Sequence, residues 1–221
     1  MTRVLLASES ERRRDWLASF LEGEGVSFHS RGLSAEEEVA PSFLDVGKKV
    51  EFTCMAKAKS ASKEHSISNN EGDSGSDVFD VVIVSDTLVE DPDDSVISMG
   101  KPTSSLEAVA MLLRLSGKRH RVWSSTAILS RSGGPLFDAP LHGGWASKIW
   151  TESSIVEFEE LSEESMVELI ESGSWKGKAG SYDMAGRASM HCRLVEGKEV
   201  TVLGLASESM EFLRNEISRR K

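Results

Sequence analysis

The sequence has few of the residues that staple a protein or anchor it in a membrane. It contains only two cysteines, Cys54 and Cys192, in 221 residues. These are too few for a disulfide framework or a structural zinc site, so we expect buried thiols in a reducing compartment. No run approaches the ~18 apolar residues of a membrane span, and the apolar stretch Val4–Ala7 is too short for a secretory signal. We therefore expect a cytoplasmic protein that does not contact a membrane.

Positive charge is also in deficit. The chain has 26 Lys and Arg against 36 Asp and Glu, a net charge of −10, within a composition that is ordinary for a globular protein. Proteins that coat duplex nucleic acid neutralise phosphates with clustered Lys and Arg, so the acid excess argues against such a partner. Residues 64–77 and 90–94 carry −4 each. The excess is thus concentrated in two predicted surface loops. It does not exclude the binding of a small anionic ligand.

The apolar pattern predicts an α/β fold, with a sheet covered by helices and no internal repeat. Residues 64–77 contain one aliphatic side chain, Ile67, and predict a mobile surface insertion within a single domain spanning 1–221. Expected strands cover Arg3–Ala7, Val26–Ser30, Phe79–Val84, Val122–Leu129 and Ser154–Phe158, with a hairpin over Ser189–Leu205. Expected helices cover Glu11–Glu22, Val46–Lys63, Ser104–Ser116, Ser162–Glu171 and Ser207–Arg219. In the third helix, the apolar face contains Leu106, Val109, Ala110 and Leu113.

Three consecutive arginines, residues 12–14, occupy the first turn of the first predicted helix. The helix dipole makes this end partly positive, so three cations are locally unfavourable unless something compensates. A phosphate group would compensate, because backbone N–H groups and guanidinium groups both bind its oxygens. A solvated basic turn is the alternative, balanced by Glu9, Glu11 and Asp15. Either Ser8 or Ser10 can cap this helix.

Asp86 follows a predicted buried strand, at the end where α/β sheets tend to bind ligands. A carboxylate there can ligate a divalent cation or take a proton from water, although Asp is also a common turn residue. Lys57, Lys101 and Lys178 are candidate phosphate partners, each individually weak because most lysines lie on the surface. The five histidines show no metal-ligand spacing.

Several short motifs occur in a fixed order. The segment Leu5–Arg13 reads L-L-A-S-E-S-E-R-R and resembles the signature L-A-S-x-S-P-R-R of the Maf family of nucleoside triphosphate pyrophosphatases. Seven or more ordered blocks across residues 4–205 make a chance match improbable. The other matching blocks are Met55–Ala58 (a Lys-Ala helix), Val84–Thr87 (A-D-T), Gly100–Pro102 (G-K-P), Leu112–Val122 (M-L-x-x-L-S-G-x-x-H-x-V), Phe158–Ser162, Lys178–Tyr182 and Val202–Leu205.

The resemblance implies a single elongated domain of the Maf and inosine triphosphatase type, with a mixed central sheet, flanking helices and a central cleft, often as a homodimer. It implies an enzyme that hydrolyses a nucleoside triphosphate to the monophosphate and pyrophosphate with a divalent metal, Mg²⁺ or Mn²⁺. Asp86 matches the family's catalytic base, and Lys57 and Lys101 match lysines of its site. Glu37, within Glu36–Glu38, matches a Glu that would hold the metal with Asp86. Substrate-binding positions fall on Ser8, Ser10, Arg12, Arg13, Thr87, Lys178 and Ala185, of which Arg12, Thr87 and Ala185 are associated with substrate choice.

The chemistry of the residues agrees with this implication. A triphosphate carries about four negative charges at neutral pH, and Arg12, Arg13, Lys57, Lys101 and Lys178 supply up to five positive ones. We expect Asp86 to position or deprotonate the attacking water, directly or through the metal, and the lysines to stabilise charge on the leaving pyrophosphate.

Three residues depart from the family pattern: Glu11 replaces a Pro, Ala185 a Gln, and Ala206 a frequent Pro. Arg12 and Thr87 resemble the branch of the family that acts on dTTP and UTP, so the resemblance implies these nucleotides, or modified pyrimidine nucleotides, as substrates. Ala185 lacks the amide that can contact a base edge. The alternative is a low-turnover nucleotide-binding regulator of cell division. Glu11, Ala185 and the acidic insertion favour this alternative.

Overall fold

The structure is a computed structural model that describes residues 1–34, 38–65, 78–131 and 136–221. Its strands form one mixed sheet in the order β2-β1-β3-β5-β7-β6, with β4 beside β3 and β8 beside β7. β1 pairs in parallel with β2 and β3, and the other pairs are antiparallel. The strands are β1 (Thr2–Ala7), β2 (Val26–Arg31), β3 (Val81–Asp91), β4 (Asp94–Met99), β5 (Arg119–Ser130), β6 (Ala139–Pro140), β7 (Ala146–Phe158) and β8 (Cys192–Glu196). The helices are α1 (Glu11–Phe20), α2 (Val46–Glu64), α3 (Ser105–Leu115), α4 (Glu163–Glu171), α5 (Glu199–Leu203) and α6 (Ser207–Ser218).

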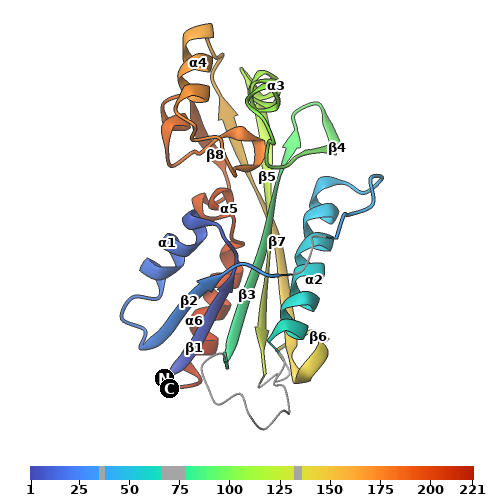
Figure 1. Cartoon of the computed structure of the whole chain (residues 1–221), viewed down its shortest axis with the longest axis vertical. Coiled ribbons are helices and arrows are strands. Elements are labelled where there is room, and N and C mark those ends of the chain that lie inside the picture. The colour runs from blue at the N-terminus through green and yellow to red at the C-terminus, as the bar shows by residue number, and fades with distance from the viewer. Residues whose placement is uncertain (35–37, 66–77, 132–135) are drawn as a thin grey trace.

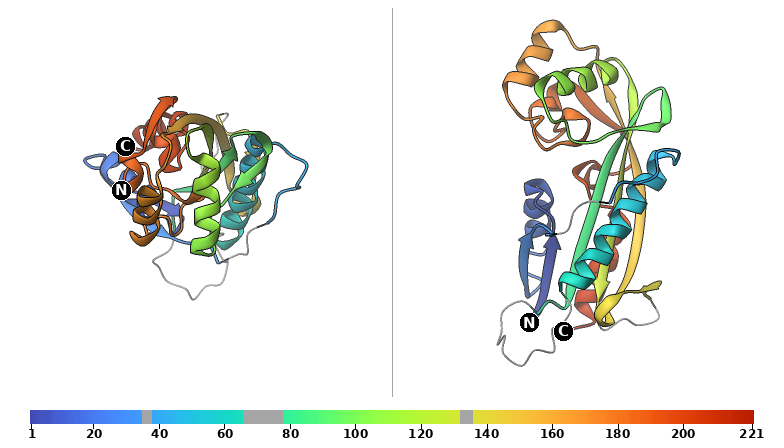
Figure 2. Two further views of the ribbon diagram at one scale, coloured as in Figure 1. Left: turned by 90° about the horizontal axis from the view of Figure 1, so that it is seen from above. Right: turned by 45° about the vertical axis from the view of Figure 1, so that its right-hand side comes forward.

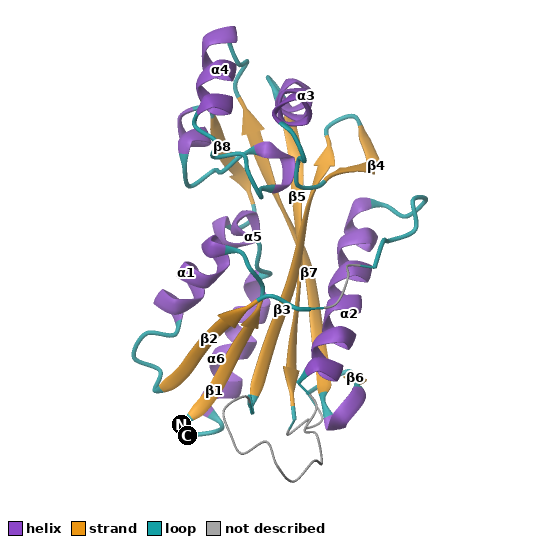
Figure 3. Cartoon of the chain, viewed as in Figure 1, coloured by secondary structure: helices purple, strands orange, loops and turns teal. Residues whose placement is uncertain are grey.

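The molecule is elongated, and the long strands β3, β5 and β7 run through both of its lobes (Figures 1 and 2). The lower lobe contains β1, β2, α1, α2 and α6, and the upper lobe contains α3, α4, β4 and β8 (Figure 3). This arrangement confirms the predicted mixed α/β class. None of the helices in the described ranges is long and apolar enough to cross a membrane.

The apolar run in β3 is buried on both faces. Val81 and Ile83 belong to a core cluster with α1 and α6, whereas Val82 and Val84 belong to a cluster with α2. A continuous β-branched run is typical of a strand covered on both sides, as the sequence predicted. A third cluster packs α3 and α4 against the upper parts of β5 and β7. The sheet therefore joins three small cores rather than covering one large core.

Asp86 lies in the middle of β3 and not directly after a strand, so that expectation was wrong. The parallel partner β1 pairs only with Val81–Ile83 and ends at Ala7, whereas β3 stays paired with β5 as far as Val89. Asp86 thus lies beyond the carboxyl end of β1, where that strand no longer covers β3. The long antiparallel pairing is a tertiary interaction that the local pattern did not show.

One predicted surface loop, residues 90–94, and the predicted apolar face of α3 differ in the structure. Glu90 and Asp91 are the buried end of β3 rather than a solvated turn, and Asp91 accepts hydrogen bonds from Arg114 at 2.6 and 2.9 Å. In α3, Leu106 and Leu113 point outward, with 79% and 61% of their surface exposed. The buried face of α3 consists of Ala108, Leu112 and Leu115.

The chain between residues 189 and 205 is not a hairpin. β8 ends at Glu196, and after Gly197 the chain forms the short helix α5 instead of a second strand. The next helix, α6, begins after Ala206, whose side chain cannot cap it. Glu152 of β7 supplies the cap instead, because its carboxylate accepts hydrogen bonds from Ser207 N at 2.9 Å and Glu208 N at 2.8 Å. The same carboxylate accepts a hydrogen bond from the Thr201 hydroxyl of α5 at 3.3 Å, so a side chain distant in sequence fixes both of the last two helices to the sheet.

A buried histidine joins β5 to the segment that follows α4. His120 is 3% exposed, and its Nε2 lies 2.8 Å from the hydroxyl of Tyr182. The imidazole also packs on the rings of Phe158 and Tyr182. Burial lowers the pKa of His120 to about 4, so the ring is neutral at physiological pH.

This low pKa predicts how stability depends on pH. An unfolded histidine has a pKa near 6.5, so between about pH 6.5 and 4 the unfolded chain binds a proton that folded His120 does not. The free energy of unfolding should fall by up to about 3 kcal/mol as the pH drops through this window. His120→Gln should remove this part of the pH dependence in urea unfolding, whereas the exposed control His142→Gln should keep it. Equal slopes for His120→Gln and the wild type would contradict the prediction.

Candidate active site

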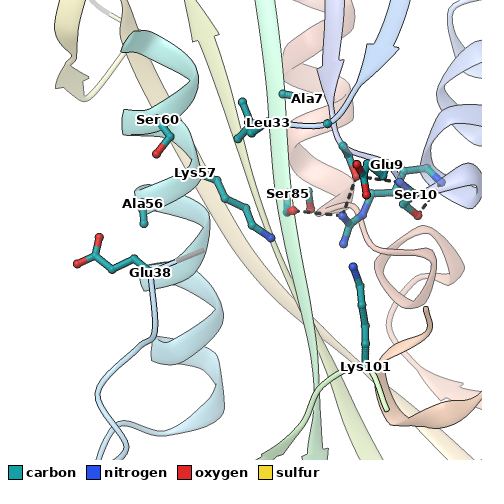
Figure 4. A pocket seen from close by; sticks show the side chains of 13 residues that line it. Ala7, Glu9, Ser10, Leu33, Glu38, Ala56, Lys57, Ser60, Ser85 and Lys101 are labelled. Carbon is teal, nitrogen blue, oxygen red and sulfur yellow. Dashed lines mark hydrogen bonds between the residues drawn. The ribbon is translucent and has the colours of Figure 1, made fainter. Parts of the chain in front are cut away.

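A polar pocket of about 230 Å³ lies where the two lobes meet. The loop after β1, the middle of α2, β3 and the chain after β4 all contribute to its wall. In Figure 4 the ammonium ends of Lys57 and Lys101 point toward the same space in front of Ser85. The lining residues are Ala7, Ser8, Glu9, Ser10, Arg13, Gly32, Leu33, Glu38, Ala56, Lys57, Ser60, Ser85 and Lys101.

Lys57 and Asp86 form an ion pair at the wall of this pocket. The Nζ of Lys57 lies 2.7 Å from Oδ1 of Asp86, and their side chains are 16% and 14% exposed. In α2, Cys54, Ala58 and Ala61 pack against the sheet, so Lys57 reaches the edge of that contact. A partly buried pair of this kind has a fixed geometry, and the second oxygen of Asp86 has no hydrogen bond to the described residues. Lys57 lines the pocket, and Asp86 lies directly behind it and is not itself among the lining residues.

The loop between β1 and α1 is held by its own serines. Ser10 is the N-cap of α1 and accepts a hydrogen bond from Arg13 N, which decides between the two caps that the sequence allowed. Ser8 accepts hydrogen bonds from Ser10 N at 3.2 Å and from the guanidinium of Arg13 at 3.3 Å. Both serines therefore line the pocket on a fixed turn.

The three arginines of α1 have three different surroundings. Arg12 pairs with Asp183 at 3.2 Å, away from the described pocket. Arg13 lines the pocket, and Arg14 is exposed and pairs with Asp15. The structure thus supports the solvated alternative for Arg14 only.

Arg13 is anchored at the carboxyl end of α5. Its Nε donates to the carbonyl of Gly204 at 2.9 Å, and its terminal nitrogens donate to the Ser85 carbonyl at 3.2 Å and the Thr87 hydroxyl at 2.6 Å. Gly204 has a φ of +112°, and an added Cβ would lie 2.5 Å from Nε of Arg13. Only glycine allows this close approach.

The segment from 178 to 186 contacts the chain that carries Lys101. Gly180 donates its N–H to the carbonyl of Gly100 at 3.1 Å and packs on Val89, so two of the sequence motifs are in direct contact. Lys101, the residue after Gly100, lines the pocket. The half-buried Lys178 is not among the lining residues.

The residues that the resemblance associates with substrate choice divide between two places. Ala185 lies beside Arg12 in a shallow apolar groove that Trp16 and Phe20 also line. Asp183 accepts a hydrogen bond from Ala185 N at 3.2 Å as well as its ion pair with Arg12. Thr87 lies instead beside Arg13. Arg12 and Ala185 are thus brought together, and Thr87 is not with them.

The pocket is less cationic than the sequence predicted. Arg13, Lys57 and Lys101 line it, but so do Glu9 and Glu38, and Asp86 pairs with Lys57. Formal charges among these six side chains cancel. Glu37, the expected metal ligand, lies outside the described residues, as do positions 66–77 of the acidic insertion. Within the described ranges, no three His, Cys, Asp or Glu side chains gather as a metal site.

Sequence reasoning missed four residues that shape the site. Ser85 is buried and its hydroxyl lies 2.6 Å from the Gly204 carbonyl. Gly32 leaves room for the side chain of Glu9, since an added Cβ would lie 2.7 Å from it. Asp183 holds Arg12. Gly204 is the fourth. Ser85 lies in the Val84–Thr87 motif and Gly204 in the Val202–Leu205 motif, but neither motif indicated what the residue contacts.

The fold and the pocket together define an α/β protein whose interlobe site suits a phosphate-bearing ligand. The family model described as Maf-like protein matches residues 3–216. The chain belongs to this family, which confirms the resemblance found in the sequence.

Similar proteins named dTTP/UTP pyrophosphatase occur in several bacteria. The one from Hahella chejuensis is 34% identical over 204 residues, covering 92% of this chain and 86% of that protein. The one from a Geobacillus species is 30% identical over 205 residues, covering 93% and 92%. Among solved structures, a HAM1 protein from Coxiella burnetii matches 99% of this chain and 100% of its own, at 11% identity and a TM-score of 0.49. That likeness is too distant to bear on function.

The contact between Gly204 and Arg13 predicts the effect of one added methyl group. Gly204→Ala should lower the free energy of unfolding by about 1–3 kcal/mol, because the backbone is strained and Arg13 must move. Gly23→Ala is the matched control, since Gly23 also has a positive φ but no atom within 4 Å of the added Cβ. It should lose about 1 kcal/mol in urea unfolding. A crystal structure of Gly204→Ala with Arg13 unmoved would contradict the prediction.

Proposed function

We propose that this chain is a nucleoside triphosphate pyrophosphatase that releases the monophosphate and pyrophosphate. The observation that carries the proposal is the Lys57–Asp86 pair, 2.7 Å apart beside a pocket that Arg13 and Lys101 also line. Such a site offers a carboxylate for a water molecule and cations for phosphate groups in one enclosed space. Its relatives are named for dTTP and UTP, so these two nucleotides, or modified pyrimidine forms of them, are the proposed substrates.

Asp86 is the proposed base. Lys57 holds Oδ1, which leaves Oδ2 to orient a water molecule and take its proton as the water attacks the α-phosphorus. The bond between that phosphorus and the bridging oxygen then breaks, and pyrophosphate leaves. Lys101 and Arg13 would bind the phosphate oxygens and stabilise the charge that develops on the leaving group.

A divalent cation fits this pocket. The described charges around it cancel, so a triphosphate with about four negative charges needs further positive charge. Mg²⁺ needs only one or two carboxylates together with substrate phosphates and water, so the lack of a three-residue cage is compatible with it. Asp86 and an acid of the 36–38 run, either Glu37 or Glu38, would hold Mg²⁺ or Mn²⁺. When bound, the metal would neutralise phosphate charge.

The base preference follows from Arg12 and the segment that faces it. Ala185 lacks the amide of the common Gln, and Asp183 engages Arg12. Recognition of the base would therefore depend on shape and apolar contact more than on a side-chain amide, which is suited to modified pyrimidines. The homodimer expected from the family stays a prediction.

Product analysis tests the reaction. The protein is incubated with dTTP or UTP and Mg²⁺ or Mn²⁺, and chromatography should show monophosphate and pyrophosphate in equal amounts. Chelation of the metal with EDTA should abolish turnover, and added Mg²⁺ or Mn²⁺ should restore it. Release of orthophosphate and a nucleoside diphosphate would contradict the proposed bond cleavage. Calorimetric binding of the nucleotides without any hydrolysis would instead favour the regulator.

Asp86→Asn tests the proposed base. The amide keeps the shape of the carboxylate but cannot take a proton, so kcat should fall at least about 100-fold with a nearly unchanged free energy of unfolding. The matched control is Asp94→Asn at the exposed start of β4, which should keep full activity. An Asp86→Asn enzyme with wild-type kcat would remove Asp86 from this role.

A further inference from the structure

Two hydroxyl groups connect Arg13 to the backbone of α5. Thr87 and Ser124 are directly opposite each other in the antiparallel pair of β3 and β5, with their hydroxyl oxygens 3.0 Å apart. A terminal nitrogen of Arg13 lies 2.6 Å from the Thr87 hydroxyl, and the Ser124 hydroxyl donates to the Thr201 carbonyl at 2.7 Å. The result is a continuous chain of hydrogen bonds from the pocket to α5.

The chemistry of the groups fixes the direction of this chain. A guanidinium has only donors and a carbonyl only accepts, so Arg13 donates to Thr87 at one end and Ser124 donates to Thr201 at the other. Each hydroxyl has a single proton. Thr87 must therefore donate to Ser124, and every polar atom in the chain has a defined role. Ser124 and Thr201 are 0% and 1% exposed, so water does not compete for these bonds.

Arg13 also contacts α5 directly. Its Nε donates to the carbonyl of Gly204, the residue that caps the carboxyl end of this helix, three residues after Thr201. The last carbonyls of a helix are unsatisfied within the helix, and arginine is a suitable partner for them. One edge of the guanidinium is thus held to α5 by a direct bond and by the chain through Thr87 and Ser124.

We propose that Thr87 and Ser124 are positioning residues that hold Arg13 in its phosphate-binding orientation. The proposal rests on the proposed function, because it requires a phosphate-bearing ligand in the pocket. A free arginine side chain has many rotamers, and fixing it before the ligand arrives reduces the entropy lost on binding. Thr87 thereby influences the substrate through Arg13, since its hydroxyl is already bonded on both sides.

Calorimetry with inorganic pyrophosphate and Mg²⁺ tests the proposal without turnover or a choice of base. Thr87→Val and Ser124→Ala should each weaken binding about 3- to 10-fold. Thr87→Ser keeps the hydroxyl and should bind within about twofold of the wild type. Ser130→Ala is the matched control: Ser130 is also fully buried in β5, but its hydroxyl accepts a hydrogen bond from Arg220 at the far end of the strand. It should leave the Kd unchanged.

A double-mutant cycle separates positioning from general structural support. In an Arg13→Met background, which removes the guanidinium, Ser124→Ala should have no further effect on the Kd, because its target is absent. Independent sites would instead show the same fold-loss in both backgrounds, within about twofold. The same cycle with Thr87→Val serves if Ser124→Ala does not fold.

The outcomes distinguish the two proposals. The positioning role would be overturned if the wild type binds pyrophosphate but Ser124→Ala weakens binding equally in the wild-type and Arg13→Met backgrounds. An unchanged Kd in Thr87→Val would also overturn it. Either result would leave the proposed function intact. A wild type that neither binds pyrophosphate nor releases it from dTTP or UTP would overturn both.

Discussion

The guanidinium of Arg13 is the interaction on which the site depends. It joins the first helix to β3 and to Gly204, a residue 191 positions away along the chain. The carbonyls of Ser85 and Gly204 both accept from it, and Ser85 bonds to Gly204 as well. A single cation thus satisfies the backbone carbonyl of Ser85 in β3 and that of Gly204 after α5. The second contact brings the chain so close to Arg13 that position 204 leaves no room for a side chain.

Much of the fold was predictable because local patterns decide it. The strand at Thr2–Ala7 and the helix at Val46–Glu64 were predicted nearly to the residue, since their apolar periodicity agrees with their packing. The extension of β3 to Asp91 was not, because five of residues 85–91 are polar or charged. They become strand through pairing with β5 as far as Val89 and with β4 beyond it. The chain after Gly197 forms a helix for a similar reason, because its position depends on Glu152 and the sheet rather than on its own sequence.

The candidate site was likewise predictable only in part. The motifs located Lys57, Lys101 and Arg13, which the structure brings to one pocket. They did not show which cations already have an acidic partner. Arg12 pairs with Asp183 and Lys57 with Asp86, and both partners are distant in sequence. Charge counted along the chain therefore overestimated the cationic character of the pocket, since ion pairing is set by tertiary structure.

The departures from the family pattern show how this chain adapts the same arrangement. At Ala206 the backbone N–H donates to the Thr126 hydroxyl at 2.9 Å, a bond that the frequent proline cannot make. Thr126 lies 3.1 Å from the hydroxyl of Ser85, which contacts Gly204. The alanine thus adds a hydrogen bond to the network that holds Arg13, whereas proline would supply only a fixed backbone angle. At this position the chain has replaced conformational restriction with a polar contact, and the geometry at Gly204 is held by side chains of β3 and β5.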